Sequence, residues 1–179
     1  ASRGNAFVLF TSHKALNHAV TLMKGKSFNI LAQGDTAKSE LLKQFQATDN
    51  CVLLGTQSFW EGVDVKGHRL RLVIIDKLPF MSPGDPLVQA RSRLIQEAGD
   101  NPFMVYQIPQ AILSLKQGAG RLIRGETDSG VVAIMDPRIK TKTYGKSFLK
   151  SLPPMTICED ESAVIKFLED IHEHETACN

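Results

Sequence analysis

An amide and two guanidinium groups stand at a helical spacing in the segment 117–124, which reads Gln-Gly-Ala-Gly-Arg-Leu-Ile-Arg. Gln117, Arg121 and Arg124 occupy positions i, i+4 and i+7, so a helix turning about 100° per residue would hold them on one face, with Gly120 beside them. The opposite face would be apolar and would consist of Ile112, Leu115, Ala119, Leu122 and Ile123. Two Arg forks beside a small residue suit a polyphosphate whose negative charge grows in a transition state. The alternative is a solvated basic face that forms surface ion pairs.

A second polar segment, 55–64, reads Gly-Thr-Gln-Ser-Phe-Trp-Glu-Gly-Val-Asp and directly follows the apolar run 51–54. It combines two glycines with hydroxyl, amide, indole and carboxylate side chains. Such a loop can bind a nucleic-acid backbone at one end and a nucleotide at the other, whereas the alternative is a plain surface turn. Because the apolar run before it is expected to be a strand, the loop should lie at the carboxyl end of that strand.

Short apolar runs that alternate with helical patterns indicate the fold class. We expect strands at residues 7–10, 29–32, 51–54, 70–75 and 131–135. Strands that are continuously apolar and separated by helices are typical of a parallel sheet covered on both faces. The sequence therefore predicts a doubly wound α/β domain, in which ligands bind beyond the carboxyl ends of the strands.

Capping residues and apolar periodicity predict the helices. Thr11 or Ser12 should cap the first helix, and Asp35 or Thr36 should begin the second. Further helices are expected at residues 85–98, from Pro109 through the segment 117–124, around residues 147–149 and from about residue 159 onward. The helix at 85–98 has an apolar stripe of Leu87, Leu94, Ile95 and Ala98, and the last helix has a core stripe of Val164, Phe167, Leu168 and Ile171. Residues 155–158 are expected to form an edge strand.

Composition and charge narrow the class of protein without identifying a ligand. An apolar fraction of 42% is sufficient for a folded core, and no apolar run is long enough for a transmembrane helix. The net charge of +2 is too small to indicate nucleic-acid binding by itself. Cys51, Cys158 and Cys178 are far apart, form no metal or disulfide framework, and fit a reducing cytosol. Cys51 opens an apolar run and is expected in the core.

Taken in order, these segments resemble the conserved motifs of the XPD/DinG family of superfamily 2 DNA helicases. The segment 55–64 resembles the fifth motif in its S-x-x-E-G-x-D form, and 117–124 resembles the sixth, Q-x-x-G-R-x-x-R. Residues 78–86 resemble the L-P-F-x-x-P-x-D-P segment of this branch, and residues 7–13 resemble the fourth motif. The order and spacing match over nearly the whole chain, and the bacterial DinG- and YoaA-like members are the more similar ones.

Other family features are missing from the sequence. Gly25 and Gly145 each precede Lys-Ser, but Val20 and Lys140 stand where the phosphate loop G-x-x-x-x-G-K-[ST] requires its first Gly. No magnesium-binding carboxylate box follows a strand, and three scattered cysteines cannot replace the four that hold this family's iron–sulfur cluster. The resemblance implies that residues 1–179 are the second, C-terminal RecA-like domain, with the N-terminal ATP-binding domain absent from this chain.

The resemblance also implies roles at the nucleotide. ATP and Mg²⁺ would be held between two RecA-like domains, and this chain would supply Arg121 and Arg124 as arginine fingers. Gln117 would contact the γ-phosphate or the attacking water. The cofactor-facing set would further include Glu61, Gly62, Asp64 and Gly120.

A single DNA strand would cross the carboxyl ends of the strands in the same comparison. The residues implied to contact it are Thr11, Ser12, Thr56, Ser58, Trp60 and Phe80. The hydroxyls would hydrogen-bond phosphates, with helix amides assisting after Ser12. Trp60 or Phe80 would stack on a base or, alternatively, pack its own loop down. Arg91 lies on the apolar stripe of its helix. It either reaches solvent past that stripe or pairs with an acid, and the alternative is a buried charge that spans two domains.

The function implied is that of the C-terminal motor half of an ATP-dependent 5′-to-3′ DNA helicase in repair or replication. The isolated chain would be inactive, and an iron–sulfur cluster would belong to the full-length protein. Implied partners are single-stranded DNA, the N-terminal motor domain and a replication or repair protein such as a polymerase accessory subunit, with no membrane and a cytoplasmic, nucleoid-associated location. Two other readings remain open: a nucleic-acid-binding regulatory domain without ATPase work, and an α/β enzyme for a phosphorylated metabolite.

Overall fold

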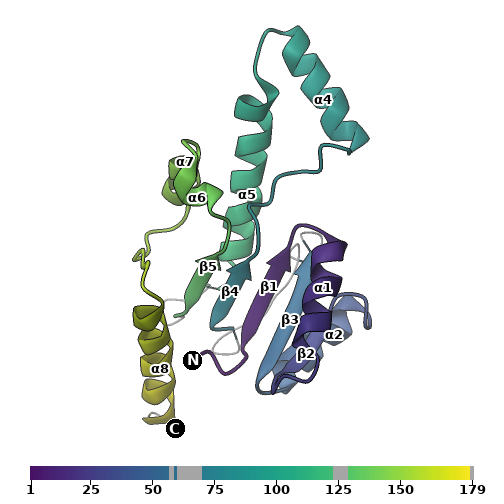
Figure 1. The fold of residues 1–179 in the computed structure, drawn as a ribbon. Coiled ribbons are helices and arrows are strands. Elements are labelled where there is room, and N and C mark those ends of the chain that lie inside the picture. The colour runs from purple at the N-terminus through teal and green to yellow at the C-terminus, as the bar shows by residue number, and fades with distance from the viewer. Residues whose placement is uncertain (57–58, 60–69, 123–128, 178–179) are drawn as a thin grey trace.

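The computed structural model describes residues 1–56, 59, 70–122 and 129–177, and its centre is a parallel sheet (Figure 1). The sheet has five strands in the order β2-β3-β1-β4-β5, and every neighbouring pair is parallel. The strands are β1 (Ala6–Phe10), β2 (Asn29–Ala32), β3 (Cys51–Thr56), β4 (Leu72–Ile75) and β5 (Val131–Ile134). All five predicted apolar runs are therefore strands, and the predicted doubly wound α/β fold is confirmed.

Side chains from the central strands alternate between two apolar clusters, one on each face of the sheet. Phe7 and Leu9 of β1 enter one cluster, together with Phe45, Leu115 and Phe148 from helices. Ala6 and Phe10 enter the other, with Leu16 from α1. Burial on both faces explains why these strands are continuously apolar rather than alternating with polar residues.

The helices cover the two faces unequally. The helix α1 (His13–Met23) packs on one face, whereas α2 (Lys38–Ala47) and α5 (Ile108–Ala119) pack on the other. Ser12 caps α1 as predicted, because its Oγ accepts a hydrogen bond from the amide of Ala15 at 3.2 Å. The predicted start of α2 at Asp35 or Thr36 was one turn early, since the carboxylate of Asp35 accepts the amide of Ala32 instead.

Between β4 and β5 the chain forms a helical arm that projects beyond the sheet (Figure 1). It consists of α4 (Pro86–Glu97), the π-helical turn η2 (Phe103–Gln107) and α5. Asp85 caps α4, and Pro109 lies in the first turn of α5 as predicted. The stripe of α4 is not buried: Leu87 and Leu94 are 59% and 66% exposed, because the helix leans away from the sheet. Arg91 is exposed, as one of the predicted alternatives has it, and its guanidinium donates to the hydroxyl of Tyr106 and lies over that ring.

After β5 the chain forms α6 (Arg138–Thr141), α7 (Gly145–Ser151) and α8 (Glu161–Ala177). The prediction of an edge strand at residues 155–158 is wrong, because this segment has no regular secondary structure and pairs with no strand in the described sheet. The last helix forms as predicted, but of its expected core stripe only Leu168 is buried. None of the helices in the described ranges combines the length and apolarity that crossing a membrane requires.

Candidate functional site

The expected site residues divide into those that the structure describes and those outside it. Ser58, Trp60, Glu61, Gly62, Asp64 and Arg124 lie outside the described residues. The described members are Thr11, Ser12, Thr56, Phe80, Gln117, Gly120 and Arg121. These seven fall on two opposite edges of the sheet.

At the carboxyl edge, the N-terminus of α1 directly follows β1. Thr11 and Ser12 are both exposed there, and Ser12 uses its Oγ as an acceptor for the amide of Ala15, which leaves the hydroxyl hydrogen available to donate. The first amides of a helix and its positive dipole end favour an anion at this position. Thr11, Ser12 and the start of α1 therefore form a surface that can accept a phosphate.

Thr56 lies at the carboxyl end of β3 on the same edge, but it is only 6% exposed. Its amide and its Oγ1 both donate to Oε1 of Gln33, at 2.7 and 2.9 Å. Gln33 follows β2, so these bonds connect the ends of two neighbouring strands. In this arrangement Thr56 supports the edge from within.

Phe80 follows β4 on this edge and belongs to an aromatic cluster. Its ring stacks on Phe103 of the arm at a centroid distance of 5.5 Å, and it meets the rings of Tyr144 and Phe148 at 5.8 Å each. The guanidinium of Arg138 lies over the same ring at 5.2 Å. These contacts support the second of the two roles weighed for Phe80, packing of its own loop.

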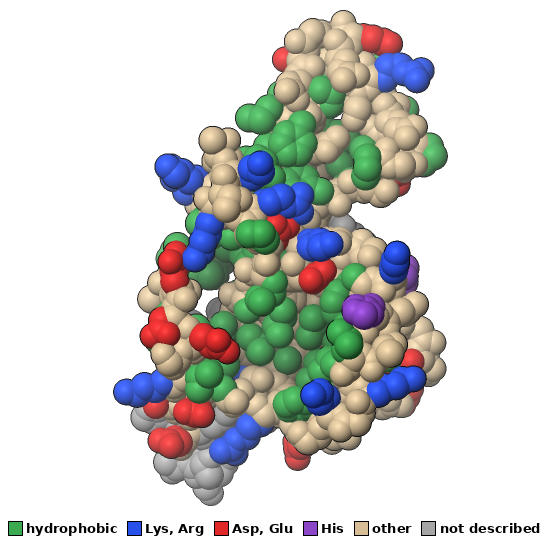
Figure 2. Space-filling view, viewed as in Figure 1, with side chains coloured by type: hydrophobic (Ala, Val, Ile, Leu, Met, Phe, Trp, Pro, Cys, Tyr) green, Lys and Arg blue, Asp and Glu red, His purple; other side chains and the backbone are tan. Residues whose placement is uncertain are grey.

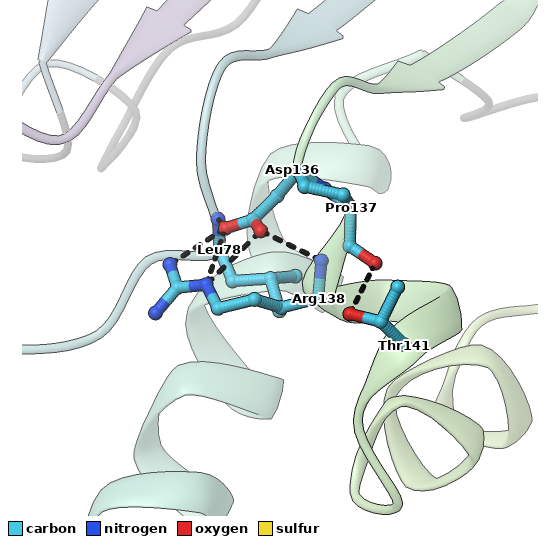
Figure 3. Close-up of polar contacts among 5 residues, drawn as sticks. All are labelled: Leu78, Asp136, Pro137, Arg138 and Thr141. Carbon is cyan, nitrogen blue, oxygen red and sulfur yellow. Dashed lines mark hydrogen bonds and ion pairs between the residues drawn. The ribbon is translucent and has the colours of Figure 1, made fainter.

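A buried carboxylate connects the ends of β4 and β5 on the carboxyl edge (Figure 3). Asp136 is 4% exposed and accepts the amide of Leu78 at 2.9 Å and that of Arg138 at 2.9 Å. The Nη2 and Nε of Arg138 also donate to this carboxylate, at 2.6 and 3.0 Å. One side chain thereby fixes the segment after β4, the start of α6 and the guanidinium over Phe80.

The charge of Asp136 is held in place by these donors. Burial alone would raise the pKa of this carboxyl, but the hydrogen bonds from Arg138 and from the amide of Leu78 outweigh it and lower the pKa of Asp136 to about 2. The same pairing raises the pKa of Arg138. The ion pair is thus fully formed at neutral pH. Asp136 and Arg138 were not among the expected site residues, although the sequence Asp-Pro-Arg after a strand marks a fixed turn.

The segment 117–124 does not form one continuous helix. The helix α5 ends at Ala119 with Gly120 as its C-cap, and Arg121 follows in a turn. The prediction that Gln117, Arg121 and Arg124 share a helix face is therefore wrong for the described pair. Gln117 is exposed in the last turn, and Arg121 is half-buried beyond the helix end.

This turn lies at the amino edge of the sheet, because α5 runs back from the arm to the start of β5. The side chain of Leu122 occupies the space beside Gly130, where an added Cβ would lie 2.8 Å from it and 2.6 Å from the carbonyl oxygen of Arg71. Gly130 and Arg71 directly precede β5 and β4. The expected ligand residues therefore lie at both edges of the sheet, with Thr11 and Ser12 at the carboxyl edge and Arg121 at the amino edge.

The chemistry of the amino edge suits an anion held by side chains. The C-terminus of α5 presents carbonyl groups and the negative end of the helix dipole, which repel phosphate. A phosphate here would have to be bound by the guanidinium of Arg121 and the amide of Gln117, both of which donate hydrogen bonds. The described part of this edge therefore offers two side-chain donors for an anion.

Two further features of the described residues are a lack of clustered metal ligands and one shallow surface hollow. Among the described residues, no group of three or more His, Cys, Asp or Glu side chains is placed to hold a metal ion. A shallow hollow of about 310 Å³ lies between α7 and the segment that precedes α8. Its lining is mainly apolar and comprises Leu149, Lys150, Leu152, Pro153, Pro154, Met155 and Ile157.

Solved structures with this fold define the class of domain. A structure titled XPD helicase aligns with a TM-score of 0.62 at 22% identity, covering 86% of this chain and 29% of that one. A second, titled XPD apo, aligns with a TM-score of 0.64 at 22% identity and covers 82% and 31%. This chain therefore has the same fold as part of these two structures.

Sequence comparison gives the family: residues 1–155 match the helicase C-terminal domain, and the chain belongs to that family, on the XPD/DinG branch. The ATP-dependent DNA helicase YoaA of Haemophilus influenzae is 48% identical over 171 residues, covering 95% of this chain and 27% of that protein. The ATP-dependent helicase DinG of Mycobacterium tuberculosis is 44% identical over 155 residues, covering 86% and 23%. The chain thus spans about a quarter of the length of these relatives.

Proposed function

We propose that this chain is the second motor domain of an ATP-dependent DNA helicase that acts in DNA repair or replication. The observation that carries the proposal is the match of residues 1–155 to the helicase C-terminal family, with the described motif residues on two opposite edges of one sheet. A motor that couples ATP hydrolysis to movement needs two separated sites joined by a rigid body, and the parallel sheet provides one. The relatives named as ATP-dependent helicases support this assignment.

The amino edge is proposed to contribute to ATP hydrolysis. Mg²⁺-bound ATP, enclosed by the N-terminal motor domain, would supply the phosphoryl group that is transferred to water. Arg121, joined by Arg124, donates to the phosphate oxygens as their charge increases, and Gln117 orients the γ-phosphate or the water. Gly120 leaves space beside them, and Glu61, Gly62 and Asp64 of the fifth motif complete the set.

The carboxyl edge is proposed to contact single-stranded DNA. Thr11, Ser12 and the first amides of α1 bind phosphates, with Ser58 beside them, and Thr56 holds the ends of β2 and β3 in place. Trp60 is proposed to stack on a base. Phe80 acts through the aromatic cluster that positions the arm.

The finer features of the proposal follow from the resemblance alone. They are movement in the 5′-to-3′ direction, an iron–sulfur cluster held elsewhere in the full-length protein, and a cytoplasmic, nucleoid-associated location. The N-terminal motor domain would be the partner that completes the ATP site. A replication or repair protein, such as a polymerase accessory subunit, would be the external partner.

Arginine substitution in the full-length protein tests the nucleotide role. Arg121→Ala should lower ATP turnover at saturating single-stranded DNA by roughly 10³-fold or more, with a much smaller change in ATP affinity, because a finger acts mainly on charge that develops in the transition state. Arg121→Lys should also fail, since an ammonium cannot present a bidentate fork. Turnover is measured by steady-state phosphate release, and ATP affinity by equilibrium binding.

Thermal melting of each variant provides the control. Arg121 is half-buried in a turn beyond the end of α5, so a finger role predicts that turnover falls far more than the melting temperature does. If Arg121→Ala retained near wild-type turnover, the residue would not be a finger, and a regulatory DNA-binding domain without ATPase work would be the better assignment. If the variant melted much earlier, the role of Arg121 would be structural.

A further inference from the structure

Positive charge is concentrated on one part of this chain. The stretch 137–158 contains five Lys or Arg residues and no Asp or Glu, whereas the whole chain carries only +2, so the remainder is net negative. Figure 2 shows Lys and Arg side chains gathered over α6 and α7 and along the neighbouring edge of the sheet. The small net charge of the chain therefore conceals a strongly basic surface.

The helices that carry these charges form a fixed platform. Gly145, at the start of α7, lies so close to α6 that an added Cβ would overlap the carbonyl oxygen of Ile139. Phe148 of α7 is fully buried in the core. The start of α6 is fixed by the bonds between Asp136 and Arg138. The lysines of both helices are thus presented from backbone that is packed against the sheet.

Three of these lysines are available to an anion. Lys140 pairs with Glu159 at 2.9 Å, and Asp136 holds the guanidinium of Arg138, so these two cations already have an acidic partner. Lys142, Lys146 and Lys150 are exposed, and within the described part of the chain no carboxylate pairs with them.

The spacing of two of these lysines also favours an anionic ligand. Lys146 and Lys150 stand at i and i+4 on α7, where two like charges repel each other and destabilise an isolated helix. An anion lying across both side chains removes this repulsion. The pair is therefore better suited to a ligand with regularly spaced negative charges than to bare solvent.

The platform lies on the same edge as the candidate DNA surface of α1. It follows the carboxyl end of β5, as Ser12 follows that of β1, and β4 lies between them with Lys77 exposed at its end. A phosphate backbone that starts at Ser12 and crosses the ends of β1, β4 and β5 would next reach α6 and α7.

We propose that Lys142, Lys146 and Lys150 bind the phosphates of single-stranded DNA and extend the DNA track of this domain onto α6 and α7. This inference rests on the DNA-binding part of the proposed function. The contacts are with phosphates, so they are independent of base sequence and weaken steeply as salt is raised. They are also made only by strands long enough to continue past Ser12 to the far end of the edge.

The test compares two triple variants in the full-length protein that carries this chain. Lys142, Lys146 and Lys150 are changed to Ala together, and the control changes Lys24, Lys26 and Lys43, which are exposed on or beside α1 and α2, away from this platform. Affinity for fluorescent oligo(dT) of increasing length is measured by anisotropy over a range of salt concentrations. Ser12→Asp, with Ser12→Asn as its neutral partner, is measured in parallel.

The proposal expects the platform variant to bind long oligo(dT) about tenfold more weakly or worse at moderate salt. The slope of log K against log salt should become shallower by about 0.7 for each lost phosphate contact, and so by about 2 for the three lysines. Short oligo(dT) should bind the platform variant and the control equally. If long oligo(dT) binds both triple variants equally while Ser12→Asp weakens binding, the platform is not part of the track. If Ser12→Asp has no effect either, the proposed DNA edge itself is wrong.

Discussion

At the scale of single residues, the carboxylate of Asp136 stabilises the carboxyl edge by holding the segment after β4 and the start of α6 together. Its pKa of about 2, against about 3.9 in an unfolded chain, corresponds to about 2.5 kcal/mol of stability at neutral pH. Because the folded pKa is the lower one, this contribution is complete above about pH 4 and is lost as the pH falls toward 2. Asp136→Asn should therefore lower the free energy of unfolding by about 2 kcal/mol at pH 7, measured by urea denaturation.

The difference between wild type and Asp136→Asn should shrink between about pH 4 and pH 2, since protonation of Asp136 removes the same charge. Asp160→Asn is the matched control, because Asp160 is exposed and its carboxylate accepts hydrogen bonds only from its chain neighbours Ser162 and Ala163. It should change stability by much less. A loss in Asp136→Asn that stayed constant down to pH 2 would show that the carboxylate charge is not what stabilises the edge.

The thiol of Cys51 gives a second prediction at this scale. Cys51 is completely buried in β3, and burial raises its pKa to about 11. Because the thiolate is the reactive form, Cys51 should resist a thiol reagent at pH 8 until the protein is unfolded, while the exposed Cys158 reacts at once. Mass spectrometry of the labelled peptides distinguishes the two. Labelling of Cys51 at the rate of Cys158 would contradict the burial of β3.

At the scale of the elements, α6 and α7 are in close backbone contact at Gly145, and this contact can be tested by substitution. Gly145→Ala would force its new methyl group against the carbonyl oxygen of Ile139. Because the backbone of both helices is packed, the two helices must move apart to make room. We expect a loss of about 2 kcal/mol or more in the free energy of unfolding. Gly84→Ala is the control, because its Cβ would meet only the Oγ of Ser82, at 3.7 Å, an ordinary contact. Equal stability of the two variants would contradict the close packing of α6 on α7.

Element positions were predictable from the sequence wherever burial set the pattern. The continuous apolar runs predicted the five strands of the described sheet, and the cap expected at Thr11 or Ser12 predicted the start of α1. Prediction failed where an apolar pattern has no element to pack against. Leu94 on the arm and Ile157 in the predicted edge strand are 66% and 65% exposed. Apolar periodicity alone does not reveal whether a partner surface is present.

The sequence proposes the candidate site as a set of residues, but it does not reveal how those residues are arranged. The motif patterns identified Ser12 and Arg121, yet the order of the motifs along the chain does not show that these residues lie on opposite edges. That separation follows from the direction of α5, which returns to the amino edge before β5 begins. The net charge of the whole chain did not reveal the basic surface that includes Lys146 and Lys150. Outside residues 137–158, acidic residues outnumber basic ones and cancel most of that positive charge.

At the scale of the whole molecule, the central claim is that one sheet separates a DNA edge from an ATP edge. Two variants of the full-length protein address the two edges. Ser12→Asp still caps α1, as Asn does, but places a negative charge where the phosphate is proposed to bind. Arg121→Ala removes the guanidinium at the amino edge without touching α1. Each variant is compared with wild type, and Ser12→Asn serves as the neutral cap control.

The decisive measurement is steady-state ATP turnover as a function of single-stranded DNA concentration for these proteins. Ser12→Asp should raise the DNA concentration needed for half-maximal turnover by about tenfold or more, while Ser12→Asn stays much closer to wild type, because only the carboxylate repels phosphate. Arg121→Ala should lower the maximal turnover by roughly 10³-fold with little change in the DNA concentration required. If both substitutions changed the same parameter, or if Arg121→Ala weakened DNA binding and left maximal turnover intact, the division of this domain into a DNA edge and an ATP edge would be contradicted.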